Sequence, residues 1–167
     1  LRDLTDAGLH AIQTSGKATR NITADPLSGL TEGEIEDARP YCELIRRWFN
    51  LHPEFSWLPG KFKIAINGAK LDETALRIHD LGLRLVRNEK GELGFSVFVG
   101  GGLGAAAMIA AETASFVPVV DILSYLESSL RIYNLKGRRD HQKKLRIKFL
   151  VRELGATEFS RLVDEDW

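Results

Sequence analysis

The chain of 167 residues contains one cysteine and no apolar run of the ~20 residues that a bilayer-spanning helix needs. Its single thiol, Cys42, excludes an internal disulfide and is typical of a reducing compartment. The composition, 44% hydrophobic and 28% charged, is ordinary for a globular protein, and a chain of this length can bury a core. These features favour one globular domain and exclude a disulfide-stapled fold.

The sequence also lacks a net charge, because 23 basic residues balance 23 acidic residues. Bulk electrostatics therefore argue against non-specific binding of nucleic acid. The balance hides a basic segment over residues 136–152, which holds eight basic residues and one acid, Asp140. Such a segment is most often a solvated face, and the alternative is a dock for an acidic partner protein.

Hydrophobic periodicity predicts strands and helices in one domain, without internal repeats or a long linker. Alternating apolar and β-branched residues predict strands or extended segments over residues 10–24, 62–67, 75–87 and 94–99. Apolar residues at helical spacing predict helices that begin near Pro40, Pro118, Leu145 and Thr157. This order predicts an α+β fold with a mixed, largely antiparallel sheet and packed helices.

Two lysines flank a phenylalanine at the start of the apolar run over residues 62–67. If this run is a strand, Lys61 and Lys63 project from the same face, because side chains alternate with a period of two. Like charges side by side repel each other, so an anion between them would stabilise the pair. The alternative is a solvated strand end, which is the commoner setting of an isolated K-x-K pattern.

Two further motifs stand on either side of this lysine pair. Residues 14–26 read T-S-G-x-x-x-R-N-I-T-x-D-P, and residues 94–104 read G-F-x-V-x-V-G-G-G-L-G. Together with L-P-x-K-F-K over residues 58–63 and the run over residues 133–140, this ordered set resembles the sirohaem-dependent nitrite and sulfite reductases. The resemblance covers nearly the whole chain, and within that family it is closest to the assimilatory sulfite reductase haemoproteins.

The resemblance implies roles for the residues that match these motifs. Sulfite and its reduced forms are anions and sirohaem is a polycarboxylate, so both need cations. Arg20 matches an arginine that contacts the anion and the sirohaem carboxylates. Lys61 and Lys63 match a lysine pair that reaches the distal face of the sirohaem, binds substrate and delivers protons. The other expected cofactor contacts are Thr14, Asn21, Gly100, Gly101 and Gly102.

The resemblance also implies a 4Fe-4S cluster, which cysteine thiolates hold in this family. With Cys42 alone the chain has no ligand set for a cluster, so we expect it to be part of a longer polypeptide. Residues 1–9 would then be the tail of a preceding ferredoxin-like domain, and residues 10–167 a sirohaem-binding domain in the first half of that protein. Four scattered histidines lack metal-ligand spacing, so we expect no zinc site: His10, His52, His79 and His141.

The resemblance therefore implies a domain of a sulfite reductase haemoprotein, which catalyses the six-electron reduction of sulfite to sulfide. The domain would bind the substrate anion and the sirohaem carboxylates, and it would be inactive in isolation. One alternative is nitrite reduction to ammonia in the same family, because the same cations serve either anion. The other is a non-catalytic anion-binding or interaction domain.

The expected partners follow from the same resemblance. They are the remaining domains of the polypeptide, the small anion, and ferredoxin or a flavoprotein as electron donor. We expect a cytoplasmic protein and no nucleic-acid or membrane partner.

Overall fold

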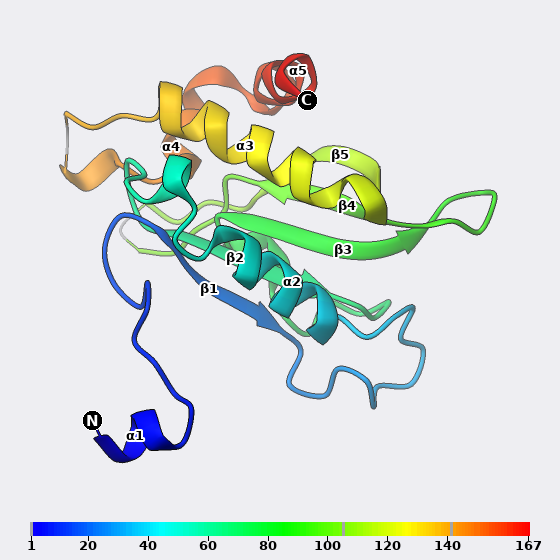
Figure 1. Cartoon of the computed structure of the whole chain (residues 1–167). Helices are drawn as coiled ribbons and strands as arrows, with labels where there is room; N and C mark the ends of the chain where they lie inside the picture. The colour runs from blue at the N-terminus through cyan, green and yellow to red at the C-terminus, as the bar shows by residue number, and fades with distance from the viewer. Residues whose placement is uncertain (1, 105, 141) are drawn as a thin grey trace.

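A computed structural model describes residues 2–104, 106–140 and 142–167 of the chain. At its centre lies a five-stranded sheet, whose strands are neighbours in chain order. The strands are β1 (Thr19–Ala24), β2 (Phe62–Asn67), β3 (Leu81–Arg87), β4 (Leu93–Val99) and β5 (Ala111–Pro118). β1, β2 and β3 are parallel, whereas β4 and β5 each run antiparallel to the strand before them. The predicted α+β fold with a mixed sheet and packed helices is confirmed (Figure 1).

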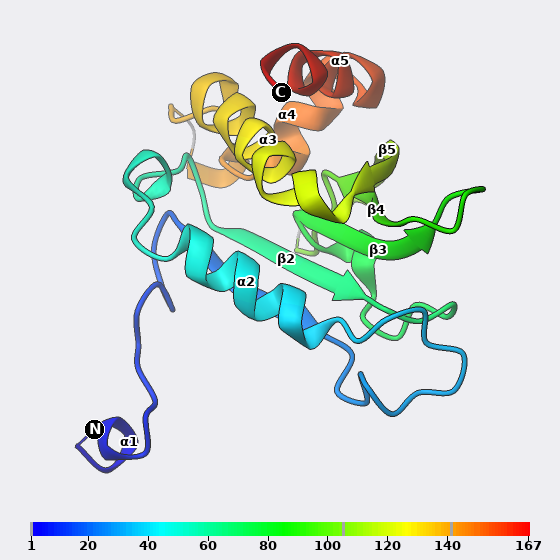
Figure 2. The same cartoon turned by 45° about the vertical axis from the view of Figure 1, so that its right-hand side comes forward.

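One face of the sheet is covered by α2 (Arg39–Phe49) and α3 (Ile122–Lys136), as Figures 1 and 2 show. The chain then continues into α4 (Ile147–Leu154) and α5 (Ala156–Asp166), which pack against α3 and against β4 and β5. The remaining elements are short: α1 (Arg2–Asp6), η1 (Pro53–Phe55), η2 (Leu76–Ile78), η3 (Val119–Asp121) and η4 (Gln142–Lys144). None of the helices in the described part of the chain has both the length and the hydrophobicity of a membrane span.

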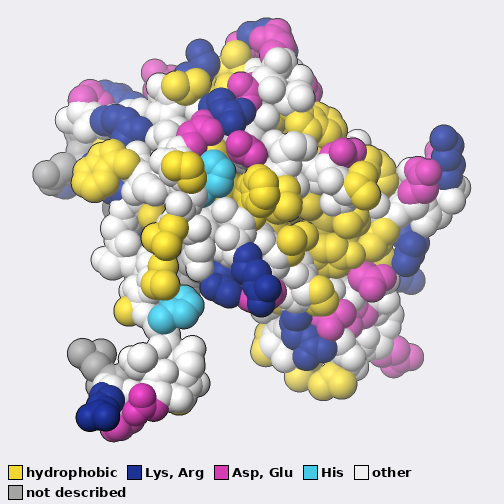
Figure 3. All heavy atoms as spheres, in the orientation of Figure 1, with side chains coloured by type: hydrophobic (Ala, Val, Ile, Leu, Met, Phe, Trp, Pro, Cys, Tyr) yellow, Lys and Arg dark blue, Asp and Glu magenta, His cyan; other side chains and the backbone are white. Residues whose placement is uncertain are grey.

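Alternate residues of a strand lie on the same face of the sheet, because successive side chains of a strand point to opposite faces. The buried side chains show on which face of the sheet the core lies. Every second residue of three strands is fully buried beneath the helices: Phe62, Ile64, Ile66, Leu81, Leu83, Leu85, Phe95, Val97 and Val99. The helices add Ile45 and Phe49 from α2 and Tyr133 from α3. In the space-filling view, hydrophobic side chains gather between α2 and α3, where the core reaches the surface (Figure 3).

The start of β3 differs from the strand expected over residues 75–87. Residues Leu76–Ile78 form a 3-10 turn, which follows Ala75 in the left-handed region at φ 52°. The turn buries Leu76 against the second face of the sheet, where a Cβ atom on Gly82 would lie 2.9 Å from the Leu76 carbonyl oxygen. The apolar residues before Leu81 therefore cover the sheet instead of extending it.

The sequence pattern does not predict β5. Burial along β5 does not alternate, because its register with β4 shifts twice, between Phe95 and Val97 and between Val97 and Phe98. These irregularities remove the period of two on which strand prediction depends. The extended segment expected over residues 10–24 likewise forms a strand only from Thr19.

The N-terminal helix α1 stands apart from the rest of the fold in both cartoon views (Figures 1 and 2). None of its residues is buried. The assignment of residues 1–9 to a preceding domain stays a prediction.

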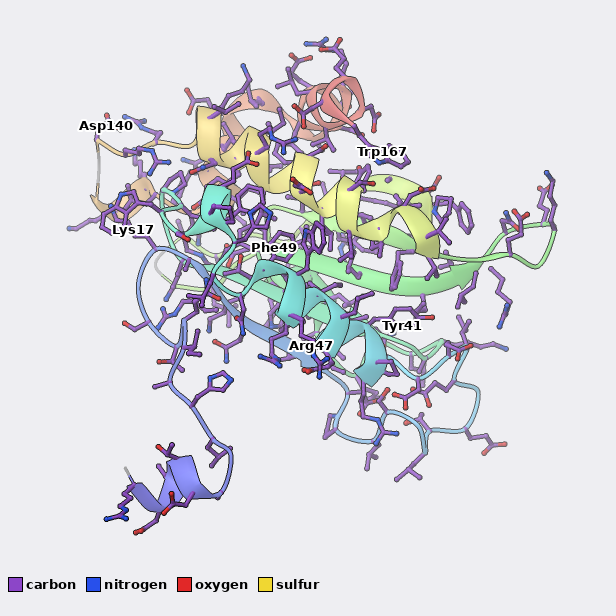
Figure 4. The ribbon with its side chains drawn as sticks, viewed as in Figure 1. Lys17, Tyr41, Arg47, Phe49, Asp140 and Trp167 are labelled. Carbon is purple, nitrogen blue, oxygen red and sulfur yellow. The ribbon has the colours of Figure 1, made fainter. Side chains whose placement is uncertain are left out.

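We predict that Phe49→Ala lowers the free energy of unfolding by about 3–5 kcal/mol, because it leaves a cavity in the core. Phe49 is 1% exposed, points from α2 toward the core, and its ring lies 5.6 Å from that of Phe55 (Figure 4). Urea unfolding followed by circular dichroism measures the loss.

Arg47→Ala in the same helix is the matched control. The Arg47 side chain is 74% exposed and forms an ion pair with Glu43 at the surface, so its loss should cost less than about 1 kcal/mol. Equal losses in the two variants would contradict the assignment of Phe49 to the core.

Candidate anion-binding site

The topology of the sheet brings the sequence motifs to one end of it. The parallel strands β1, β2 and β3 all begin at this end, and the antiparallel β4 finishes there, as the pairing of Leu81 with Val99 shows. Arg20 therefore lies near Lys61, which directly precedes β2. The glycine loop, which we define as residues 100–104, follows β4 at the same end. Motifs separated by up to about half of the chain thus become neighbours.

A cavity of about 590 Å³ opens at this end of the sheet. Its walls come from the start of β1 and the segment before it, the residues directly before β2, the end of the glycine loop with Ala106 beyond it, and the start of α4 with the segment that leads into it. Figure 4 shows Lys17 at this end, on the side of the molecule where Asp140 lies. Seven cationic residues line the cavity: Lys17, Arg20, Lys61, Lys143, Lys144, Arg146 and Lys148. No carboxylate is among the described lining residues.

Within residues 2–104, 106–140 and 142–167, most of this positive charge lacks a carboxylate partner. Among the described residues, Arg146 is the one lining cation that forms an ion pair. Arg20 instead donates two hydrogen bonds to the Thr14 carbonyl, at 2.7 and 3.1 Å, and the Lys17 ammonium lies 5.8 Å from the Trp57 ring centroid. Clustered like charges in a concave site create a strong positive potential, which attracts a small anion or a polycarboxylate.

Lys61 and Lys63 flank the buried Phe62, and both line a second cavity of about 300 Å³. The prediction that the two lysines share a face is therefore confirmed. The second cavity shares Lys61 and Arg146 with the first, so the two are adjacent and together form one cationic site. His79 also lines it, with Nδ1 3.1 Å from the Ala75 carbonyl oxygen. We did not predict His79 here, because a lone histidine beside an aspartate gives no spacing signal.

Asp80 connects the parts of the site from beneath. Its side chain is 0% exposed, and its carboxylate accepts hydrogen bonds from the Lys63 backbone N–H at 3.0 Å and from Arg146 Nε at 2.9 Å. Its backbone carbonyl accepts a third bond, from the N–H of Gly100. Burial raises the pKa of Asp80 to about 6, although Arg146 opposes the rise. The buried carboxylate thus joins the lysine strand to the basic segment, and the backbone of the same residue holds the glycine loop.

The three predicted glycines lie beneath the cavities and do not line them. Gly101 is packed so closely that a Cβ atom would lie 2.3 Å from the Arg77 carbonyl oxygen, and a Cβ on Gly102 would lie 2.7 Å from the Arg146 guanidinium. The loop residues that line the two cavities are Leu103 and Gly104. A cofactor contact of Gly100, Gly101 and Gly102 therefore stays a prediction.

Two other predicted contacts lie at the margin of the site. Thr14 is exposed and acts through its carbonyl oxygen, which holds Arg20. Asn21 is exposed on β1 and lines neither cavity. Sequence reasoning missed the four cations of the basic segment that line the cavity, because a run of basic residues does not indicate which of them turn inward.

The described residues contain no group that suits a metal cluster. They include no set of three or more histidine, cysteine or acidic side chains that could hold a metal ion. Cys42 lies half-buried on α2, and burial raises the pKa of its thiol to about 12, so the thiol is protonated at neutral pH. His141 lies outside the described residues. The donor set of the described residues does not fit a 4Fe-4S cluster.

Comparison with known proteins decides the family. The family described as nitrite and sulphite reductase 4Fe-4S domain matches residues 15–167 of the chain. The chain belongs to the nitrite and sulphite reductase family. The family assignment that the sequence motifs implied is therefore confirmed.

Relatives named as sulfite reductases and relatives named as nitrite reductases both align with nearly the whole chain. Sulfite reductase (ferredoxin) 1 of Mycolicibacterium paratuberculosis is 30% identical over 99% of this chain and 30% of its own length. A ferredoxin–nitrite reductase of Leptolyngbya laminosa is 31% identical over 98% of this chain and 33% of its own length. The chain thus spans about a third of the length of these relatives.

Solved structures agree with the family. The NirA protein of Mycobacterium tuberculosis matches 99% of this chain and 30% of its own, with a TM-score of 0.90 at 29% identity. Dissimilatory sulfite reductase I matches 90% of this chain and 53% of its own, with a TM-score of 0.72. At 12% identity, the second likeness shows the fold alone.

We predict that Asp80 makes the stability of the chain depend on pH between about 4 and 6. The folded pKa of about 6 lies above the ordinary value of 3.8, so the folded state binds the proton more strongly than the unfolded state. The stability that this proton contributes is fully present below about pH 4 and is lost as the pH rises through about 6. The stability of the wild type relative to Asp80→Asn should therefore fall by up to about 3 kcal/mol over this window and stay level above it.

Urea unfolding of both proteins at intervals from pH 4 to pH 7 measures this difference. Glu89→Gln, in the exposed β3–β4 turn, is the control and should show no such window. A difference between wild type and Asp80→Asn that does not change with pH would disprove the role of Asp80 titration.

Proposed function

We propose that the chain is the domain of an assimilatory sulfite reductase that binds the substrate anion and the carboxylates of sirohaem. One observation carries the proposal: seven cations line one cavity, and among the described residues only Arg146 of these is paired with a carboxylate. Family membership supports it, because sulfite and nitrite are both small oxyanions. If the cluster had only a structural role, its positive charges would repel one another and no anion would offset the repulsion.

The donor set of the cavity fits a polycarboxylate such as sirohaem. Arginine and lysine side chains bind carboxylates through charge-assisted hydrogen bonds, and six of the seven cations have no carboxylate partner among the described residues. When bound, sirohaem would supply the iron that holds the substrate and receives electrons. The chain would contribute Lys143, Lys144 and Arg20 to the carboxylates of the macrocycle.

Arg20 and the lysine pair would act on the substrate itself. The Thr14 carbonyl fixes the Nε side of the Arg20 guanidinium, and the remaining N–H groups are left for an anion. Lys61 and Lys63 present two ammonium groups to the same cavity, where they would neutralise the anion and donate protons to oxygen as it leaves as water.

Sulfite is the proposed substrate, and nitrite is the alternative. Relatives named for each anion match the chain at nearly equal identity, so sequence likeness does not separate them. Ferredoxin is the proposed electron donor, because both relatives carry it in their names. We further propose that the domain works within a longer polypeptide and is inactive alone, because its described residues offer no ligand set for the cluster.

A non-catalytic docking domain is less well supported. Four of the eight basic residues over 136–152 line the cavity, and they are therefore placed for a small ligand. A flat docking surface for an acidic protein would present these charges outward.

We predict that Lys61→Met or Lys63→Met, in the reductase polypeptide that contains this domain, lowers sulfite turnover by about 100-fold or more. Each substitution removes one preorganised positive charge from the site and leaves the buried Phe62 in place. Steady-state turnover, with nitrite measured in parallel, also decides between the two substrates.

The matched control is Lys90→Met in the exposed turn between β3 and β4, which should retain full activity. Thermal melts accompany each assay. A variant that loses thermal stability in proportion to its activity would contradict a direct role for that lysine.

A further inference from the structure

Lys148 is a buried lysine with an unusual set of partners. It lies on α4 and is 3% exposed. Its ammonium donates hydrogen bonds to three backbone carbonyls, those of Ala106 at 2.6 Å, Leu103 at 3.1 Å and Gly102 at 3.4 Å. Burial lowers the pKa of Lys148, and the neighbouring charge of Arg146 lowers it further.

A buried charge is normally paired with an opposite charge, because its removal from water is costly. Among the described residues, Lys148 forms no ion pair within 4 Å, and Asp80 attracts it only through space. Backbone carbonyls at the end of the glycine loop take the place of a carboxylate. The charge of Lys148 is therefore satisfied by the loop, and the loop carbonyls are satisfied by Lys148.

The direction in which these carbonyl oxygens point affects the electrostatic potential in the cavity. A carbonyl oxygen carries partial negative charge, so a loop that presented its carbonyls to an anion would repel it. Lys148 binds two of them, at Gly102 and Leu103, together with the Ala106 carbonyl just beyond the loop. Arg146 also contacts the loop, with Nη1 3.5 Å from the Leu103 carbonyl oxygen. Leu103 and Ala106 are then left to line the cavity.

We propose that Lys148 is a positioning residue, which holds the glycine loop at the cavity wall and draws its carbonyl oxygens away from the bound anion. This inference rests on the proposed function of the cavity and adds to it a residue that no sequence motif indicated. The geometry that carries it is one buried ammonium within hydrogen-bond distance of two carbonyls of the glycine loop, those of Gly102 and Leu103, and of the Ala106 carbonyl just beyond it.

The test compares Lys148→Met with Lys144→Met in the full 167-residue chain. Both substitutions remove one positive charge from the same cavity, but the Lys144 side chain makes no hydrogen bond to the loop within the described residues. Amide hydrogen exchange of residues 100–104 measures the loop without any ligand. Fluorescence titration with the metal-free tetrapyrrole of sirohaem measures affinity for a polycarboxylate.

For Lys148→Met we expect exchange in the loop to be about ten-fold faster or more, and the dissociation constant to rise by about ten-fold or more. For Lys144→Met we expect weaker binding, which depends on salt, with unchanged exchange in the loop. If Lys148→Met does not fold, Lys148→Gln replaces it, because its amide keeps N–H donors without the charge.

Three results would overturn the proposal. Unchanged exchange in the loop of the Lys148 variant would show that this lysine does not hold the loop, whatever happens to affinity. Faster exchange with unchanged affinity would show that the loop position does not serve binding. Equal effects of the Lys148 and Lys144 substitutions on exchange would show that only charge matters. Failure of the wild type to bind the tetrapyrrole at all would instead contradict the proposed function.

Discussion

The site depends on one buried carboxylate that does not itself line the cavity. Asp80 bonds to the backbone of β2 at Lys63, to the glycine loop at Gly100 and to the basic segment at Arg146. A carboxylate taken out of water must be hydrogen-bonded and paired, so β2 and the basic segment are held where the carboxylate oxygens can be satisfied, while the glycine loop is held by the backbone carbonyl of Asp80. The raised pKa shows that the compensation is incomplete. The buried carboxylate of Asp80 thus helps to position the cationic residues Lys63 and Arg146.

The charged residues of the site form two layers with different functions. The outer layer consists of cations that have no carboxylate partner in the described part of the chain, such as Arg20, Lys61 and Lys63, which set the potential of the cavity. The inner layer consists of Asp80, Arg146 and Lys148, whose groups are bonded to one another or to the backbone. A change in the outer layer alters charge at nearly constant shape, whereas a change in the inner layer alters shape. Gly100, Gly101 and Gly102 belong to the inner layer, because a Cβ atom on each would lie within 3 Å of a neighbouring atom.

Local patterns predicted what depends on local geometry. The common face of Lys61 and Lys63 follows from the period of a strand, and the helix that begins near Pro40 follows from the preference of proline for a first turn. Asp80 and Lys148 gave no such signal, since an acid before a strand and a lysine in a basic run are usually solvated. Their burial depends on how α4 returns to the end of the sheet, which is a tertiary property. β5 was missed for the opposite reason, because its irregular register erased a local signal.

The β3–β4 hairpin separates its turn from the site by its full length. Leu81 pairs with Val99 beside the cavity, whereas Arg87 pairs with Leu93 next to the turn over residues 88–92, about 20 Å away along the strands. The turn is exposed, and within the described residues its side-chain bonds are local. It is therefore the natural place for length variation, an epitope or a fluorophore, because an insertion there lengthens the molecule without touching the electrostatics at its other end.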